Sequence, residues 1–184
     1  KKKIIITGGL GYIGTELCKI YSGFSWHHKI IVIDNRFVSE RVNQLRNWNI
    51  EFIQGDILNK ELIEKYFSDA DIVHHLAGIT DVPRTQGESS AKKDEEIKLV
   101  AKEGTQNILD VINDKCKIIF PSTHVVFEGI EKVKNNIEEN ENTKPILSYS
   151  TSKALNEKQL KESGKNYIIL RLGSVYGYST DTAR

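Results

Sequence analysis

Methionine is absent from the 184 residues, even at position 1, although a few would be expected at ordinary usage. We therefore expect the sequence to be an incomplete part of a longer protein. Cysteine is also scarce, and Cys18 and Cys116 fall in a predicted helix and a predicted strand. Two reduced, buried thiols are the expected state, which is typical of a cytoplasmic protein. Because no Cys/His spacing resembles a zinc site, we expect no metal.

Long apolar runs and an excess of charge of one sign are missing as well. No apolar stretch approaches the roughly 18 residues of a membrane-spanning helix, and the formal net charge is only +1. The balanced charge gives no electrostatic reason to expect binding to nucleic acid or to an anionic membrane. The length is sufficient for one domain with a substantial core.

The most informative stretch is residues 3–14, KIIITGGLGYIG. The apolar run at 4–6 is too short for a helix and is typical of a buried strand. The glycines after it fit two overlapping spacings, G-x-G-x-x-G from Gly9 and G-x-x-G-x-x-G from Gly8. Glycine lets the chain turn sharply and approach a pyrophosphate closely, and the helix that follows points its free N–H groups at the phosphates. The stretch predicts a dinucleotide site, with a purely structural turn as the alternative.

Apolar runs and helical patterns alternate along the rest of the chain. Continuous Ile/Val runs indicate strands buried on both faces. Their alternation with helices predicts an α/β fold, a doubly wound, Rossmann-like parallel sheet with helices on both faces and strand order 3-2-1-4-5-6. Strands are expected at 4–6, 29–33, 50–54, 71–76, 116–122 and 167–172, and helices at 11–22, 37–48, 59–68, 91–113 and 148–163.

Acidic residues follow the second and third predicted strands. Asp34 lies 25 residues after Gly9, where an acid in this fold accepts hydrogen bonds from the adenosine ribose. It would repel the 2′-phosphate of NADP and so favours NAD, although Arg36 weakens this preference. Asp56 could reach the adenine amino group. An ordinary solvated Asp is the alternative for each.

A second motif is Tyr149-Ser150-Thr151-Ser152-Lys153. A helix presents Tyr149 and Lys153 on one face, because they are four residues apart. A nearby ammonium group, together with the positive nicotinamide ring, would stabilise the phenolate and allow proton exchange with a substrate hydroxyl. The spacing alone is common on surface helices; its position after the fifth strand gives it weight.

Hydroxyl and imidazole groups stand at the ends of the central strands, where such sheets build their sites. Ser122 and Thr123 both follow the fifth strand and could bind the substrate oxygen that Tyr149 addresses, and Thr123 is preferred. His124 and His75 could face the site, but a packed or solvated role is expected for both. No spacing supports a Ser-His-Asp arrangement.

Together these motifs make the sequence resemble the extended short-chain dehydrogenase/reductase family, which includes NAD-dependent nucleotide-sugar epimerases and dehydratases. The matching segments keep the family's order over essentially the whole chain. They are TGGLGYIG at 7–14, Asp34, Gly55-Asp56-Ile57, His75-Leu76-Ala77-Gly78, Gly104-Thr105, Ser122-Thr123, YSTSK at 149–153 and RLGSVYG at 171–177. The resemblance implies NAD as cofactor, a nucleotide sugar as substrate, and a homodimer formed through the helices at 91–113 and 148–163.

The resemblance also implies roles for single residues. Thr123 aligns with the catalytic Ser/Thr, Tyr149 with the base, and Lys153 with the group that holds the nicotinamide ribose and lowers the pKa of Tyr149. The residues that would line NAD are Gly8, Gly11, Tyr12, Ile13, Gly14, Asp34, Asn35, Asp56, Ile57, Leu76, Ala77, Gly78, Tyr149 and Lys153.

Two departures from the family pattern bear on the reaction. Ala101 stands where members often carry Asn, which would alter a water or proton relay near Lys153. Dehydratases resemble T-D-E-V-Y-G after the fifth strand, where Asp and Glu eliminate water, whereas this chain has THVVF at 123–127.

The expected function is therefore epimerisation, most simply at C4 of the sugar. A net oxidoreductase of the same family and a non-catalytic NAD sensor are the alternatives. Residues 1–184 are expected to form the NAD-binding domain, with the family's C-terminal substrate-binding portion outside them.

Overall fold

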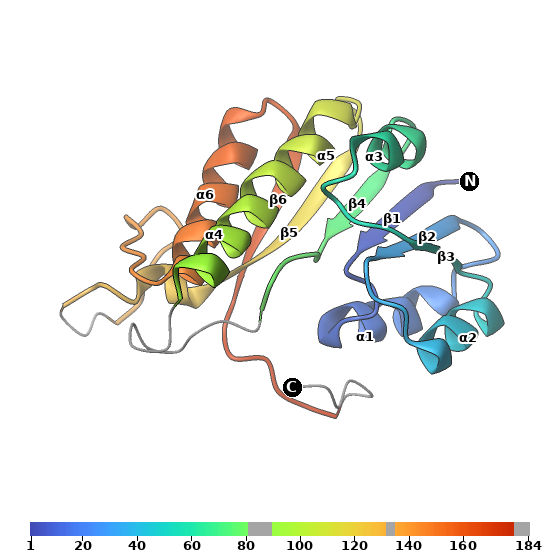
Figure 1. The fold of residues 1–184 in the computed structure, drawn as a ribbon, viewed down its shortest axis with the longest axis horizontal. Coiled ribbons are helices and arrows are strands. Elements are labelled where there is room, and N and C mark those ends of the chain that lie inside the picture. Colours follow the sequence, from blue (N-terminus) through green and yellow to red (C-terminus); the bar gives the residue numbers. More distant parts are fainter. Residues whose placement is uncertain (81–89, 132–134, 179–184) are drawn as a thin grey trace.

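A six-stranded parallel sheet forms the centre of the computed structural model, which describes residues 1–80, 90–131 and 135–178. The strand order is β3-β2-β1-β4-β5-β6, so the predicted doubly wound order is confirmed (Figure 1). The strands are β1 (Lys3–Thr7), β2 (Lys29–Asp34), β3 (Glu51–Gln54), β4 (Ile72–His75), β5 (Lys117–Thr123) and β6 (Asn166–Leu172).

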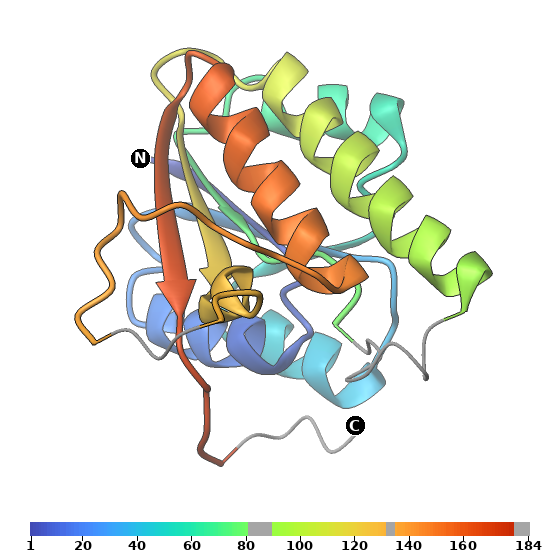
Figure 2. The same cartoon turned by 90° about the vertical axis from the view of Figure 1, so that its left-hand side faces the viewer.

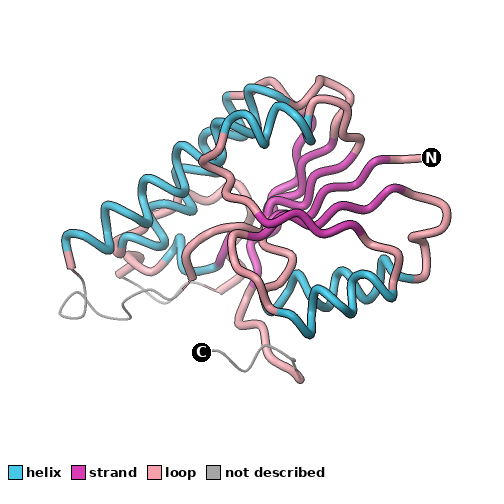
Figure 3. Tube along the Cα trace, turned by 45° about the vertical axis from the view of Figure 1, so that its right-hand side comes forward, coloured by secondary structure: helices cyan, strands magenta, loops and turns pink. Residues whose placement is uncertain are grey.

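Helices cover both faces of the sheet, as Figure 3 shows. The pair α1 (Tyr12–Ser22) and α2 (Ser39–Asn47) lies on one face. The other face carries α3 (Lys60–Phe67), α4 (Ala91–Leu99), the π-helical turn η2 (Val100–Gly104), α5 (Thr105–Val111) and α6 (Ser148–Glu162). A short 3₁₀ turn, η3 (His124–Phe127), follows β5. None of the helices in the described ranges is both long and apolar enough to cross a membrane.

The core forms two layers because side chains alternate along each strand. Ile4 and Ile6 of β1 pack with Cys18 of α1 in one layer, while Ile5 packs in the other layer with Phe67 and the residues of α5. Both cysteines are free and buried, as predicted. The alternation also fixes which residues of each strand can face the helices of the opposite layer.

The predicted helix at 91–113 is continuous in space but not regular. Its backbone widens into the π-helical turn η2 between α4 and α5. The continuous segment formed by α4, η2 and α5 runs beside α6 (Figure 2). Asn156 of α6 donates a hydrogen bond of 2.8 Å to the Ala101 carbonyl inside this turn. A side chain inserted into the helical ladder is a recognised cause of such irregularity, and π turns are frequent at functional sites.

The expectation that all the strands are buried on both faces is wrong for β6. Ile169 packs into the core beside α6, but its neighbours Ile168 and Leu170 are 39% and 44% exposed. The strand lies at the edge of the sheet, beyond the reach of α1 and α2. The apolar run at 167–172 therefore signals a strand correctly but does not tell which of its faces is covered.

Candidate functional site

The glycine turn joins the end of β1 to the start of α1 at very close backbone approach. Gly8 has φ +65°, and a Cβ there would lie 2.8 Å from the Ala77 nitrogen. A Cβ on Gly14 would lie 2.5 Å from the Gly8 oxygen. Helix α1 has no side-chain cap at Gly11 and no acid in its first turn. Its first N–H groups are thus suited to an anion such as a pyrophosphate, so the residues present fit a dinucleotide.

Asp34 has a role that its sequence position did not predict. Its carboxylate is only 6% exposed and accepts hydrogen bonds of 3.0 Å from the Leu10 N–H of the glycine turn and from the Arg36 N–H. The Arg36 Nε lies 3.5 Å from the same carboxylate. Asp34 therefore holds the glycine turn in place, and the Arg36 charge stands beside it.

The other residues predicted to line NAD surround this turn at the carboxyl ends of the strands. The amide of Asn35 donates to Asp56 over 3.2 Å, which joins the ends of β2 and β3. The Ile57 side chain is 5% exposed and packs in the core, so its backbone is the part available to a cofactor. The remaining residues follow β1 (Gly8, Gly11, Tyr12, Ile13, Gly14) and β4 (Leu76, Ala77, Gly78).

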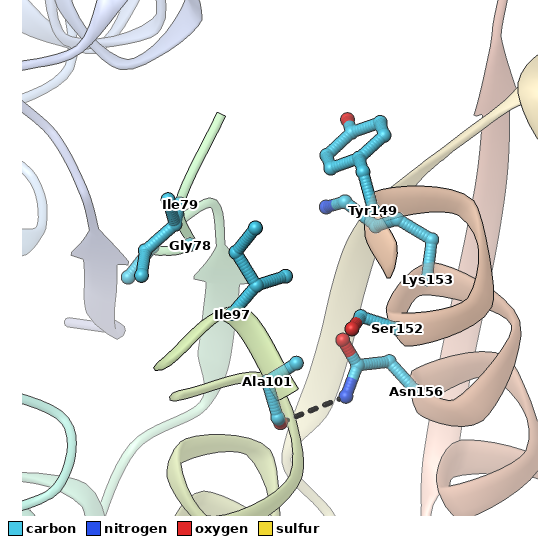
Figure 4. A pocket seen from close by; sticks show the side chains of 9 residues that line it. Gly78, Ile79, Ile97, Ala101, Tyr149, Ser152, Lys153 and Asn156 are labelled. Atoms are coloured by element: carbon cyan, nitrogen blue, oxygen red, sulfur yellow. Dashed lines mark hydrogen bonds between the residues drawn. The ribbon is translucent and has the colours of Figure 1, made fainter. Parts of the chain in front are cut away.

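Tyr149 and Lys153 extend from the first turns of α6 toward the end of β4 (Figure 4). The Lys153 ammonium donates a hydrogen bond of 2.9 Å to the Pro121 carbonyl and lies 4.5 Å from the centroid of the Phe120 ring. It is 5.8 Å from the centroid of the Tyr149 ring. The predicted placement of the two side chains on one face of a helix is thus what the structure has.

The electrostatics of this pair differ from the sequence-based expectation. Burial lowers the pKa of Lys153 to about 8, because an ammonium loses solvation there. Burial also raises the pKa of Tyr149 above its usual value. In the protein alone, desolvation is the cause of the raised pKa of Tyr149. A positive charge held beside the ring, such as an oxidised nicotinamide, would act in the opposite direction.

The structure separates the two candidate hydroxyls at the end of β5. Ser122 donates its only hydroxyl proton to Glu157 over 2.6 Å and is 4% exposed. Thr123 accepts a hydrogen bond of 3.2 Å from the Val125 N–H and keeps its own proton for another acceptor. Thr123 is therefore the better candidate for a substrate oxygen.

The histidines have the structural roles that were expected. His75 is 1% exposed, and its ring nitrogens lie 3.1 Å from the Thr7 hydroxyl and 2.9 Å from the Thr105 hydroxyl. Burial, together with the Lys153 charge, lowers the pKa of His75 to about 3. His124 is exposed and its Nδ1 lies 3.2 Å from the Leu172 carbonyl.

A pocket between β4, η2 and α6 collects several of these groups (Figure 4). It contains the predicted residues Ala77, Gly78, Tyr149 and Lys153, but Thr123 and the glycine turn lie outside its lining. Ala101, which the sequence analysis placed near Lys153, also lines the pocket, and the lining residues that it missed are Ile79, Ile97, Ser152 and Asn156.

Ser152 and Asn156 could have been found, since they lie three and seven residues after Tyr149 on the same helical face. The Ser152 hydroxyl is buried, and no residue in the described part of the chain bonds to it. A buried hydroxyl without a partner suits a pocket that receives a polar ligand.

Comparisons with known proteins agree with this geometry. The model of the NAD dependent epimerase/dehydratase family matches residues 4–184. A dTDP-D-glucose 4,6-dehydratase of Dictyostelium discoideum is 33% identical over 96% of this chain and 44% of its own length. A UDP-glucose 4-epimerase of Neisseria meningitidis serogroup C is 28% identical over 89% of this chain and 49% of its own length.

A solved structure extends the similarity to three dimensions. The UDP-glucuronic acid 4-epimerase of Bacillus cereus, in complex with NAD and a fluorinated UDP-glucuronic acid, has a TM-score of 0.82 and 26% identity. The match covers 97% of this chain and 58% of the other. This chain thus spans about half the length of the relatives it matches. With a family model matched over nearly all of its residues, the chain belongs to the NAD dependent epimerase/dehydratase family.

Proposed function

We propose that this chain is the NAD-binding part of a nucleotide-sugar epimerase that inverts C4 of the sugar. The observation that carries the proposal is that Tyr149 and Lys153 share a pocket with Ala77 at the carboxyl end of β4, and Ala77 lies against Gly8 of the glycine turn. Two features support it further: Thr123 has a hydroxyl proton to donate, and relatives include UDP-sugar 4-epimerases. The whole protein's activity is proposed on these grounds.

The residues around the glycine turn would hold NAD by its phosphates and adenosine. The N–H groups of α1 suit the pyrophosphate, and Asp34 suits the adenosine ribose and opposes a 2′-phosphate. Lys153 would hold the nicotinamide ribose through its ammonium group. When bound, NAD supplies a hydride acceptor that can return the hydride to the sugar carbon.

The chain's own residues would move the proton of the sugar hydroxyl. Thr123 would orient the sugar oxygen, and Tyr149 as phenolate would take its proton. Burial raises the pKa of Tyr149, and a positive charge held close to the ring would favour the phenolate. After the sugar ring turns, Tyr149 returns the proton to the same oxygen, so the protein ends each cycle unchanged.

The residues after β5 support an epimerase over a dehydratase. Elimination of water needs an acid and a base beside the sugar, but Thr123 is followed by His124 and Val125. The His124 ring points to the Leu172 carbonyl at the edge strand β6. The similarity to the dehydratase of Dictyostelium discoideum therefore supports the family and the fold. We do not propose dehydration as the reaction of this protein.

The localisation, the oligomeric state and the sugar-binding portion are proposed from membership of the family. We expect a cytoplasmic homodimer that contacts its partner through α4, α5 and α6, whose outer surfaces are rich in charged side chains. We also expect the wall that selects the sugar to come from polypeptide outside residues 1–184, since the relatives are about twice as long. No role in binding nucleic acid or a membrane is proposed.

The test is a screen of UDP-, GDP-, dTDP- and CDP-sugars with NAD present, in which NMR follows the configuration of the product. We expect a C4 epimer from at least one sugar, without net formation of NADH. Tyr149→Phe, which keeps the ring but loses the phenol proton site, should lower kcat by at least ~100-fold and leave NAD affinity within about threefold. Accumulation of NADH in step with product would instead indicate a net oxidoreductase, and full activity of Tyr149→Phe would refute the assignment of the base.

A further inference from the structure

We propose that Glu157 is a positioning residue that, through Ser122 and Arg171, fixes Thr123 against Tyr149 and Lys153. This inference rests on the proposed function, because it concerns how that proton-transfer site is held together. Glu157 was not singled out from the sequence, and it lies outside the pocket lining. We call the contacts among these three residues the Glu157 brace.

The Glu157 brace joins three elements through one buried carboxylate. Glu157 Oε1 accepts hydrogen bonds from the Ser122 hydroxyl at 2.6 Å and from Arg171 Nε at 2.9 Å. Its Oε2 accepts from Arg171 Nη2 at 2.7 Å. The carboxylate side chain is 3% exposed and that of Arg171 is 14% exposed. A two-bond pair of this kind fixes orientation as well as distance.

The carboxylate stays charged in this environment. Burial acts to raise the pKa of Glu157, but the hydrogen bonds from Arg171 and Ser122 outweigh burial and hold that pKa below its usual value. Three donated hydrogen bonds from β5 and β6 therefore converge on an acceptor that has no proton of its own. The charge also binds Ser122 more strongly than a neutral acceptor would.

The position of the brace connects it to the proposed chemistry. Ser122 directly precedes Thr123, and Glu157 lies one helical turn after Lys153 on α6. Arg171 also places its guanidinium carbon 5.0 Å from the centroid of the Phe127 ring, in the turn that follows Thr123. The brace thus contacts the residue before Thr123, the turn after it, and the helix that carries the base.

A second tie between β5 and α6 explains why the brace is needed. Lys153 donates to the Pro121 carbonyl, one residue before Ser122. If the Lys153 ammonium turns to a cofactor ribose, as the proposed function requires, that tie is lost. Among the described residues, the bond from Ser122 to Glu157 then remains to hold the end of β5 against α6. A misplacement of about 1 Å at such a site can cost about 100-fold in rate.

The rival explanation is that the brace stabilises the fold and nothing more. Ser122→Ala separates the two, because it removes the tie from β5 to α6 and leaves the ion pair of Glu157 with Arg171. Asn113→Ala is the matched control. Its amide donates to the Ser68 and Ala70 carbonyls and its oxygen accepts from the Lys115 and Cys116 N–H groups, at the opposite end of β5.

The experiment titrates the Tyr149 phenolate by ultraviolet absorbance in the full chain, with and without NAD, using Tyr149→Phe to subtract the other tyrosines. We expect NAD to lower the wild-type midpoint by about one pH unit or more, as an added positive charge does. Ser122→Ala should show less than half of this shift while its NAD dissociation constant stays within twofold. Asn113→Ala should lower Tm and keep the full shift. If Ser122→Ala does not fold, Glu157→Gln takes its place, because it keeps the shape of the side chain and one acceptor oxygen. Its NAD-induced shift and its NAD dissociation constant should then meet the limits given for Ser122→Ala.

The outcomes distinguish the brace from the proposed function. If NAD shifts the midpoint equally in the wild type and in Ser122→Ala, the brace is overturned and the base assignment stands. If NAD leaves the wild-type midpoint unchanged, the phenolate base is contradicted, and the brace falls with it because it has no base to position. With UDP-glucose as the probe substrate, the brace also predicts at least a tenfold lower kcat in Ser122→Ala with little change in KM.

Discussion

At the scale of single residues, burial decides which titratable groups can take part in chemistry. His75 has a donor or acceptor on each ring nitrogen and a pKa lowered to about 3 by burial and by the Lys153 charge. Burial likewise lowers the pKa of His74 to about 4, and its Nε2 lies 2.7 Å from the Tyr21 hydroxyl. Both rings are therefore neutral parts of the core, whereas Tyr149 and Lys153 line the pocket beside β4.

These neutral histidines predict how stability depends on pH. Their folded-state pKa values lie below the usual 6.5, so their contribution is complete above pH 6.5 and is lost as the pH falls toward their folded values. Between pH 7 and pH 5 each should cost about 2 kcal/mol, since the unfolded chain takes up the proton. Urea unfolding of His75→Gln should show about half of the wild-type decrease. The exposed His27→Gln should keep it, and an unchanged decrease in His75→Gln would contradict the account.

At the scale of elements, the sequence predicted what depends on local pattern. The strands and helices were placed from apolar periodicity, and the doubly wound order followed from their alternation. The π-helical turn was not predicted, and the hydrogen bond that Asn156 donates to its Ala101 carbonyl comes from a helix more than fifty residues away, which local pattern does not reveal. Glu157 was missed for the same reason, since its partners Ser122 and Arg171 lie on two other elements.

The same distinction applies to the start of α6. Glu128 accepts hydrogen bonds of 2.7 Å from the Ile146 and Leu147 N–H groups and a further bond from the Ser150 hydroxyl. A distant acid therefore anchors the two residues that precede the helix carrying Tyr149 and one side chain of its first turn. The local sequence places this helix correctly but does not reveal what holds its first turn.

The junction of β1 with α1 gives a prediction at this scale. A Cβ on Gly14 would lie 2.5 Å from the Gly8 oxygen and 2.6 Å from the Gly9 Cα, so Gly14→Ala must push α1 away from the glycine turn. We expect a loss of about 1–3 kcal/mol in the free energy of unfolding and at least tenfold weaker NAD binding. The control is Gly23→Ala, whose Cβ would meet nothing closer than 3.7 Å. Thermal unfolding with and without NAD tests both, and equal NAD stabilisation of the two variants would contradict the proposed phosphate site.

At the scale of the whole molecule, the strand order explains why the candidate site lies where it does. The chain leaves β1 toward β2 on one side and returns to β4 on the other. The connections after β1 and β4 therefore diverge at the carboxyl edge of the sheet, and ligands bind at such a switch point in this architecture. The glycine turn approaches Ala77 closely, and Ala77 lines a pocket with Tyr149 and Lys153, so the proposed phosphate site and the proposed proton-transfer site lie at the same end of the sheet.

The most direct test of the central claim follows a labelled sugar through one reaction. The nucleotide sugar that the screen identifies is prepared with deuterium at C4 and incubated with the protein and NAD, while NMR follows the product and absorbance at 340 nm follows NADH. We expect the C4 epimer of that sugar to keep its deuterium at C4, with no net rise in absorbance. Loss of the label to water, or NADH accumulating in step with a keto-sugar, would contradict it.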